Sequence, residues 1–167
     1  MKKLLGLTLA VMMASTHAHA LTKSQFVGDW RCTTQFEFDD GGQERTVTLD
    51  TMNADGSMSQ LWEVVSRNVK GHLVSVEHFS IKNRWSVKGD ELRIFDFDLV
   101  EYVGYDKEKL PYHDEAQAEL KGYWVELYQE PYDSKVKFID KDTMIFPQDD
   151  GTSNTTCVRL TPNGATS

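Results

Sequence analysis

The sequence contains few of the residues and motifs that indicate a catalytic or cofactor site. Its 167 residues include only two cysteines and four prolines. There is no Gly-x-Ser-x-Gly motif, no His-Glu-x-x-His motif and no phosphate-binding loop, and neither cysteine has a second cysteine or a histidine close to it in sequence. We therefore expect a protein that is not an enzyme and that uses neither a metal nor a cofactor.

Long apolar segments are also absent, with one exception at the N-terminus. Lys2 and Lys3 precede an apolar run at 4–13 that is too short to span a bilayer, and residues 18–20 (Ala-His-Ala) form a small-x-small cleavage site. Residues 1–20 are therefore predicted to be a signal peptide of bacterial style, cleaved on export to the periplasm or beyond. No cysteine follows the cleavage site, so we expect no lipid anchor. No other apolar run approaches membrane-spanning length, so we expect no insertion into a membrane.

Basic residues are in the minority. The chain has 18 Lys and Arg against 26 Asp and Glu, a net charge of −8. Cleavage of the leader removes Lys2 and Lys3, which leaves 16 basic residues against 26 acidic ones and a net charge of −10. Nucleic acids and anionic membranes are therefore not expected as partners, because both attract positive charge. A basic protein partner and simple solubility remain as the two explanations of the charge.

The rest of the chain shows the alternation of short β-strands separated by turn residues. In the first strand Trp30, Cys32 and Thr34 share one face, and a hairpin turn follows at 39–42. One short helix is expected at 113–121, which begins with acidic residues and is followed by glycine. The predicted strands are 28–38, 44–50, 58–67, 73–82, 92–103, 123–129, 135–139, 143–146 and 155–161, with 83–87 either continuing the fourth strand or forming another.

About eight to ten short strands with close connections predict an all-β fold. We expect a single antiparallel up-and-down β-barrel over 21–161, followed by a flexible tail at 162–167. Cys32 lies on the first predicted strand and Cys157 on the last. In an oxidising compartment these two cysteines are expected to form a disulfide, which requires the first and last strands to be neighbours and so favours a closed barrel.

The first strand also carries a family resemblance. The motif Phe26-x-Gly28-x-Trp30 resembles the Gly-x-Trp signature of the lipocalins and their small bacterial relatives. In that family the tryptophan closes the floor of the barrel, and a basic residue from the last strand region packs across it. The resemblance implies this pair of roles for Trp30 and Arg159. It also implies a ligand cavity inside the barrel.

Tyrosine is concentrated in one part of the chain, between positions 102 and 132, around the predicted helix and the loop before it. Tyrosine is enriched at recognition surfaces because it combines a large contact area with a hydroxyl group. We expect this segment to form a lid or a contact surface, the alternative being ordinary strand residues and a solvated loop. The candidate ligand- or partner-binding residues are Tyr102, Tyr105, Tyr112, Tyr123, Trp124 and Tyr128.

The predicted strand at 92–103 carries apolar residues on both of its faces. Phe95, Phe97 and Leu99 form one row, and both faces cannot point into a small barrel. Either a β-bulge switches the register, or something covers the aromatic row. The covers considered are the helix at 113–121 first, a homodimer through this row second, and a foreign protein third.

Asp96 and Asp98 lie opposite that row and form the only close pair of carboxylates in an informative setting. If they point into a cavity they are candidates for contact with a ligand or partner, and one of them would then have a raised pKa. The alternatives are an outward polar face, or inward acids that are hydrogen-bonded to Tyr or Arg.

Two functions fit these observations. The first is a secreted or periplasmic, lipocalin-like binding protein for a small apolar or amphipathic ligand. The second is a periplasmic inhibitor or immunity protein that neutralises a basic hydrolase or toxin through its acidic, tyrosine-rich segment. An open cavity lined by apolar residues favours the first, and a filled barrel with exposed tyrosines and carboxylates favours the second.

Overall fold

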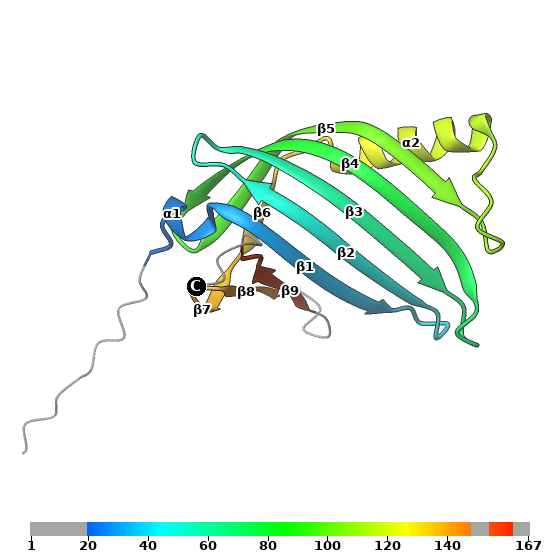
Figure 1. Cartoon of the computed structure of the whole chain (residues 1–167), viewed down its shortest axis with the longest axis horizontal. Coiled ribbons are helices and arrows are strands. Elements are labelled where there is room, and N and C mark those ends of the chain that lie inside the picture. Colours follow the sequence, from blue (N-terminus) through cyan, green and yellow to red (C-terminus); the bar gives the residue numbers. More distant parts are fainter. Residues whose placement is uncertain (1–19, 148–153, 162–167) are drawn as a thin grey trace, which may run out of the picture.

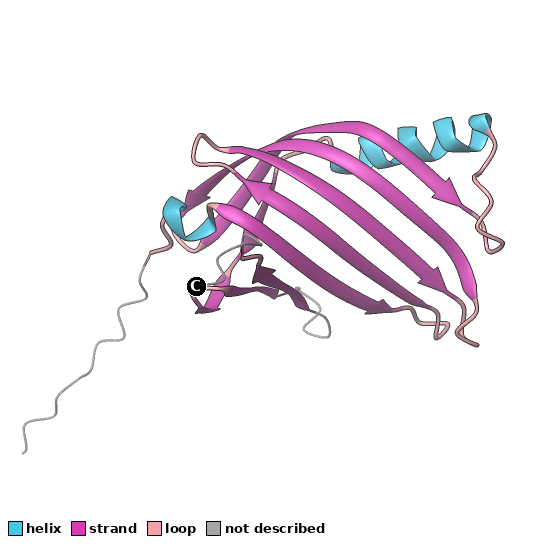
Figure 2. Cartoon of the chain, viewed as in Figure 1, coloured by secondary structure: helices cyan, strands magenta, loops and turns pink. Residues whose placement is uncertain are grey.

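The computed structural model describes residues 20–147 and 154–161, so the predicted leader before Ala20 and the predicted tail lie outside the described residues. Within them, nine strands form one sheet that curls into a nearly closed barrel (Figures 1 and 2). The elements are α1 (Lys23–Phe26), β1 (Gly28–Glu37), β2 (Gln43–Met52), β3 (Ser57–Arg67), β4 (Leu73–Lys88), β5 (Glu91–Tyr105), α2 (Asp114–Tyr128), β6 (Tyr132–Lys135), β7 (Lys137–Asp140), β8 (Thr143–Pro147) and β9 (Asn154–Arg159).

The strands follow an up-and-down order. Neighbours in the sheet are antiparallel, and the order is β6-β5-β4-β3-β2-β1-β9-β8-β7. The first and last strands, β1 and β9, are paired, which confirms the predicted all-β single barrel. No helix within the described residues is both long and apolar enough to cross a membrane.

The two ends of this sheet meet in one short stretch of chain, residues 132–140. Its first part, β6, pairs with β5, and its second part, β7, pairs with β8. Val136 lies between the two parts, is buried, and donates its backbone N–H to the carbonyl of Asp90 over 3.1 Å. The chain therefore changes its pairing partner at Val136, and this change closes one end of the barrel.

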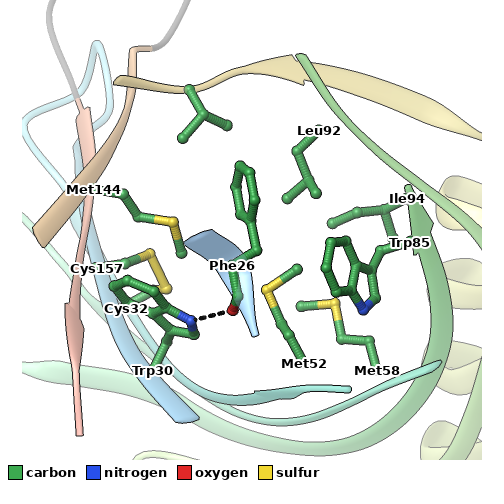
Figure 3. Packing of buried hydrophobic residues seen from close by; sticks show 11 residues of the cluster. Phe26, Trp30, Cys32, Met52, Met58, Trp85, Leu92, Ile94, Met144 and Cys157 are labelled. Atoms are coloured by element: carbon green, nitrogen blue, oxygen red, sulfur yellow. Dashed lines mark hydrogen bonds between the residues drawn. A yellow bond between two sulfur atoms is a disulfide. The ribbon is translucent and has the colours of Figure 1, made fainter. Parts of the chain in front are cut away.

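Inward-facing side chains fill that closed end as a floor cluster (Figure 3). The cluster draws one or two residues from most strands, because alternate residues of each strand point inward. β4 contributes Trp85 and runs unbroken past Asn83, so residues 83–87 continue the fourth strand. The floor cluster consists of Phe26, Trp30, Cys32, Met52, Met58, Trp85, Leu92, Ile94, Val136, Met144 and Cys157.

Trp30 is fully buried in the floor cluster, beside the disulfide (Figure 3). Its indole N–H donates to the carbonyl of Phe26 over 2.7 Å, so α1 is tied directly to β1. The guanidinium of Arg159 lies 4.1 Å from the centroid of the Trp30 ring, a cation–π contact. The same guanidinium donates to the backbone carbonyls of Val27 and Gln25 over 2.6 and 2.7 Å. Trp30 and Arg159 thus have the geometry that the lipocalin resemblance implied.

Gly28 is the residue that lets Arg159 reach the chain so closely. Its φ is +131°, a backbone conformation that side chains disfavour. A Cβ atom at this position would lie 2.6 Å from Nη1 of Arg159. Glycine is therefore required here, because a side chain would disfavour this φ and would collide with Arg159.

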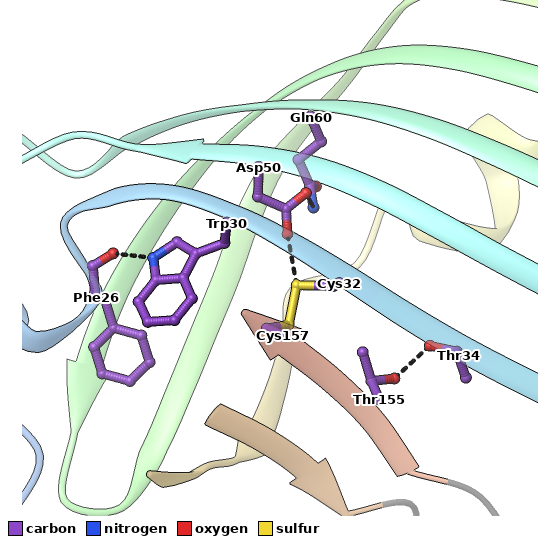
Figure 4. Close-up of a disulfide and its surroundings, with 8 residues drawn as sticks. All are labelled: Phe26, Trp30, Cys32, Thr34, Asp50, Gln60, Thr155 and Cys157. Atoms are coloured by element: carbon purple, nitrogen blue, oxygen red, sulfur yellow. Dashed lines mark hydrogen bonds between the residues drawn. A yellow bond between two sulfur atoms is a disulfide. The ribbon is translucent and has the colours of Figure 1, made fainter. Parts of the chain in front are cut away.

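The predicted disulfide between Cys32 and Cys157 is present (Figure 4). The two cysteines are directly opposite each other in the β1–β9 pair, with their Cα atoms 3.9 Å apart. Both are buried in the floor cluster. The covalent bond therefore joins the first and last strands at the place where their pairing completes the wall.

The long helix differs from the prediction. α2 covers Asp114–Tyr128, so the predicted strand at 123–129 is wrong, and β6 begins at Tyr132, before the predicted strand at 135–139. Gly122 does not end the helix. Leu120, Trp124 and Tyr128 follow at intervals of four, which places them on one helical face, and that face packs on the sheet. This tertiary contact overrides the β-preference of the aromatic residues.

β5 carries two register shifts against β4, and these explain its two apolar faces. Asp96 has a left-handed φ of 57° beside the first shift. Ile94 faces inward opposite Trp85, and after the shift Leu99 faces inward opposite Ile81. The predicted β-bulge is therefore present.

The predicted single row of Phe95, Phe97 and Leu99 is wrong for the same reason. Phe95 is paired with the exposed Arg84 and so faces outward, whereas Leu99 is buried on the inner side. Phe97 stacks on Tyr128 of α2 with ring centroids 5.5 Å apart. The shared surface that a homodimer through this row requires is thus divided between the two faces of the sheet.

Replacing Trp30 by alanine should destabilise the fold by about 3–5 kcal/mol. The substitution leaves a large cavity in the floor cluster and removes the ring against which Arg159 packs. Urea unfolding followed by circular dichroism measures the change. A loss below about 1 kcal/mol would contradict the full burial of Trp30.

The disulfide should contribute about 4–5 kcal/mol, because the loop that it closes spans 125 positions. Reduction should lower the melting temperature, and the double variant Cys32→Ser, Cys157→Ser should melt at the same lower temperature. Both are measured by thermal unfolding with and without reductant. Two free thiols per molecule in folded protein isolated without reductant would refute the bond.

Candidate ligand-binding cavity

A cavity of about 390 Å³ lies inside the barrel, between the floor cluster and α2. Residues from β1, β2, β3, β5, β6, β8, β9 and α2 line it. The cavity exists because the inner residues of β1 and β2 above the floor are mostly small, whereas α2 covers the larger side chains on the inner face of β3, β4 and β5.

One wall of the cavity is made of threonines: Thr34 from β1, Thr46 and Thr48 from β2, and Thr155 from β9. The hydroxyls of Thr34 and Thr155 share a hydrogen bond of 2.6 Å across the β1–β9 pair. Each threonine presents a methyl group as well as a hydroxyl. This wall can therefore contact an apolar body and also bind a polar group.

The adjoining wall is aromatic, and Trp62 on β3 is the direct neighbour of Thr48 on β2. Trp62 of β3 meets Tyr128 of α2 edge to face at 5.5 Å, and Tyr128 stacks on Trp124 at 5.9 Å. Met52, Met58 and Met144 form the bottom of the cavity. The indole nitrogen of Trp62 is buried and has no hydrogen-bond partner among the described residues. A buried N–H without a partner is uncommon in folded proteins, so this wall has an unused donor.

Polar contacts hold α2 against the barrel at two places. The carboxylate of Glu77 on β4 accepts the Tyr102 hydroxyl over 2.9 Å and the Trp124 indole N–H over 3.1 Å. Burial and the nearby Glu77 raise the pKa of Tyr102, which keeps it a donor. Near the start of α2, the Gln117 side chain accepts the N–H of Gly104 and donates to its carbonyl. The aromatic wall is therefore fixed in place.

Asp50 is the most deeply buried charged residue that lines the cavity, with 7% of its surface exposed. One carboxylate oxygen accepts the Gln60 amide N–H over 3.0 Å, and Gln60 in turn accepts an N–H of Asn83 over 2.5 Å. The other oxygen lies 3.4 Å from Sγ of Cys32, a disulfide sulfur without a proton (Figure 4). Burial raises the pKa of Asp50 from 3.8 to about 6, and the Gln60 amide and then the Thr48 hydroxyl oppose that shift.

Glu44 is a second carboxylate in the lining, six residues before Asp50 on the same face of β2. It accepts a long hydrogen bond of 3.5 Å from the Ser66 hydroxyl. Burial and then the neighbouring charge of Glu77 raise the pKa of Glu44, and the Ser66 bond lowers it. Among the described residues, the cavity lining therefore carries two carboxylates and no lysine, arginine or histidine.

The structure brings some of the predicted binding residues together. Trp124 and Tyr128 line the cavity directly. Tyr102 lies next to them, buried on the inner face of β5, and shares Glu77 with Trp124. These three residues form one cluster although β5 and α2 are separate elements.

Three other tyrosines lie outside the cavity. Tyr105 meets His78 edge to face at 5.7 Å, and His78 is exposed on β4. Tyr112 packs on Gly104, where its ring fills the space that a Cβ atom would need. Tyr123 is 56% exposed on the outer side of α2. The tyrosine-rich segment thus contributes to the cavity, to local packing and to the outer surface.

Asp96 and Asp98 do not enter the cavity. Both are exposed, and Asp98 is paired with the exposed Lys82 on the outer side of β4. The outward-facing alternative for this pair is the one that the structure shows. Within the described residues, no group of three or more His, Cys, Asp or Glu side chains is arranged to hold a metal ion.

Asp50 and the threonine wall were not identified from the sequence. The signal that could have found them is the alternation along β2. Every second residue faces inward, and these inward residues are Glu44, Thr46, Thr48 and Asp50. Four polar residues on the inner side of a barrel strand indicate that this side is not filled by apolar packing.

The raised pKa of Asp50 predicts a pH dependence of stability. Between pH 3.8 and about 6 the folded chain holds the Asp50 proton more tightly than the unfolded chain, so stability falls as pH rises through this range. Above it, ionised Asp50 opposes folding by up to about 3 kcal/mol.

Asp50→Asn should reduce this pH slope, leaving the part that the raised pKa of Glu44 contributes, and should be more stable than the wild type above pH 6. Urea unfolding at a series of pH values measures both effects. Asp98→Asn removes an exposed carboxylate from the outer face and is the matched control, which should keep the slope. An unchanged slope in Asp50→Asn would show that Asp50 is not its source.

No protein-family model matches this chain, and no curated protein is significantly similar to it in sequence. The likeness to lipocalins therefore rests on the Gly28-x-Trp30 motif with Arg159 and on the barrel itself. The chemistry of the cavity is what remains to indicate a function.

Proposed function

We propose that this protein binds a small amphipathic ligand in the barrel cavity and acts as a binding protein rather than as an enzyme. The observation that carries the proposal is the cavity of about 390 Å³, which lies within the usual size range of small-molecule sites. Its lining combines an aromatic and methionine surface with a few convergent polar groups, which is the usual composition of such sites.

Unused hydrogen-bonding capacity supports the same proposal. The Trp62 indole N–H has no partner among the described residues, and the Asp50 carboxylate accepts only one N–H from a side chain. Leaving such groups unpaired costs free energy, and a ligand with complementary groups recovers it. The disulfide between Cys32 and Cys157 fits the proposal that the protein works in the periplasm or outside the cell, where disulfides persist.

The inhibitor or immunity function is the second candidate, and the outer side of α2 supports it. Tyr123, Val125 and Leu127 expose 56%, 39% and 52% of their surfaces there. Acidic residues on the same helix would suit a basic partner. The cavity favours the ligand-binding proposal, because a protein that acts through its outer surface has no need of an unfilled barrel.

Nile red, a neutral apolar dye, should bind in the cavity and increase its fluorescence, at one site per protein. Thr46→Phe fills the threonine wall and should weaken this binding at least about tenfold, because one or two contacts of the dye are lost. Thr51→Phe makes the same change on the same strand but on the exposed outer side, and it should bind like the wild type.

Two outcomes would contradict the proposal. The first is the absence of dye binding to the folded wild type. The second is equal weakening by Thr46→Phe and Thr51→Phe, which would place the dye outside the cavity. A Thr46→Phe protein that has a native circular dichroism spectrum and still binds the dye with wild-type affinity would likewise place the dye outside the cavity.

A further inference from the structure

The charged side chains that line the cavity are all of one sign in the part of the chain that the structure describes. Glu44 and Asp50 are the carboxylates of this lining, and no basic side chain of the described residues contributes to it. Among the described residues neither carboxylate takes part in an ion pair. Because the effective dielectric constant is low inside a barrel, an anionic ligand would be repelled here more strongly than in water.

The Asp50 carboxylate can accept further hydrogen bonds from a ligand. A carboxylate has about four acceptor sites, and the protein supplies only neutral donors, the Gln60 amide and the nearby Thr48 hydroxyl. The disulfide sulfur beside the other oxygen has no proton to donate. A buried carboxylate in this state is normally paired with a cation, and the described residues of 20–147 and 154–161 do not provide one in the lining.

The aromatic wall can accept the rest of such a ligand. Trp62, Trp124 and Tyr128 present a continuous set of rings, and methionines form the bottom. Aromatic faces attract cations as well as apolar groups, and methionine adapts to varied shapes. The lining is therefore suited to an apolar body that carries a positive group.

We infer that the ligand is an amphipathic cation, in which a protonated amine binds the Asp50 carboxylate and an apolar body packs on the aromatic wall and the methionines. This inference rests on the proposed function, because it concerns the ligand of the same cavity. The amine replaces the missing cation and donates charge-assisted hydrogen bonds, which are roughly twice as strong as neutral ones.

The titration of Asp50 agrees with this assignment. With a pKa of about 6, the side chain is mainly ionised at neutral pH and becomes neutral in mild acid. Two other titratable groups affect its surroundings: Glu44 on the same strand and Tyr132 on β6, whose pKa is raised by burial, by Tyr128 and by Asp50. Neither supplies positive charge, so the amine should be released as the pH falls through 6.

Displacement of Nile red by three probes of equal chain length tests the inference: decylamine, decanol and decanoate. At neutral pH decylamine should displace the dye at a concentration about tenfold lower than decanol, and decanoate should be the weakest. The preference for the amine over decanol should disappear as the pH falls below the pKa of Asp50, because the carboxyl group is then neutral. The three probes share an apolar body, so differences among them report the headgroup.

Asp50→Asn should reduce the ratio of amine to decanol affinity to about one, with a native circular dichroism spectrum as the check of folding. Asp98→Asn changes the same charge on the outer face and should keep the tenfold ratio. Loss of the ratio in Glu44→Gln but not in Asp50→Asn would show that the assignment to Asp50 is wrong.

The remaining outcomes separate the inference from the proposed function. If Nile red binds but decanol or decanoate displaces it as well as decylamine, the cavity binds a ligand and the inference of a cation is overturned. If neither Nile red nor any of the three probes binds, the proposed function itself fails.

Discussion

The pairing of β1 with β9 is the contact on which the rest of the structure depends. A sheet of this order becomes a barrel only when its first and last strands meet, and here the meeting point combines backbone hydrogen bonds, a disulfide and Arg159 above Trp30. The Arg159 guanidinium covers one face of the Trp30 ring, so without Arg159 the floor would be open on that side. The cavity exists because this floor fills one end of the barrel and leaves the volume above it unfilled.

Much of the fold could be predicted because its signals are local. Alternation along β1 and β2 and the glycine turns between strands predict antiparallel hairpins, and two cysteines on the first and last strands predict closure. The stretch from Tyr123 to Tyr128 could not be assigned in the same way. Its aromatic residues prefer strands, and only the packing of Trp124 and Tyr128 on the inner face of the sheet makes the helix the favourable state.

The site was predictable only in part, for a related reason. Trp124 and Tyr128 could be predicted from the local concentration of aromatic residues. Asp96 and Asp98 were predicted from their spacing alone, and the bulge in β5 turns them outward. Asp50 looked like an ordinary polar strand residue. Its importance comes from burial beside a disulfide and from the absence of a basic neighbour, and both depend on strands that are distant in sequence.

One wall of the cavity is a helix, and a helix completes its backbone hydrogen bonds within itself. From residue 95 to 104, the side of β5 turned away from β4 has no strand partner among the described residues, and α2 covers it mainly through side chains. Changes at Trp124 or Tyr128 can therefore reshape the cavity without breaking a ladder between strands. Ligand preference and barrel assembly are thus encoded in different parts of the chain, which makes α2 the natural place for evolution or protein engineering to alter specificity.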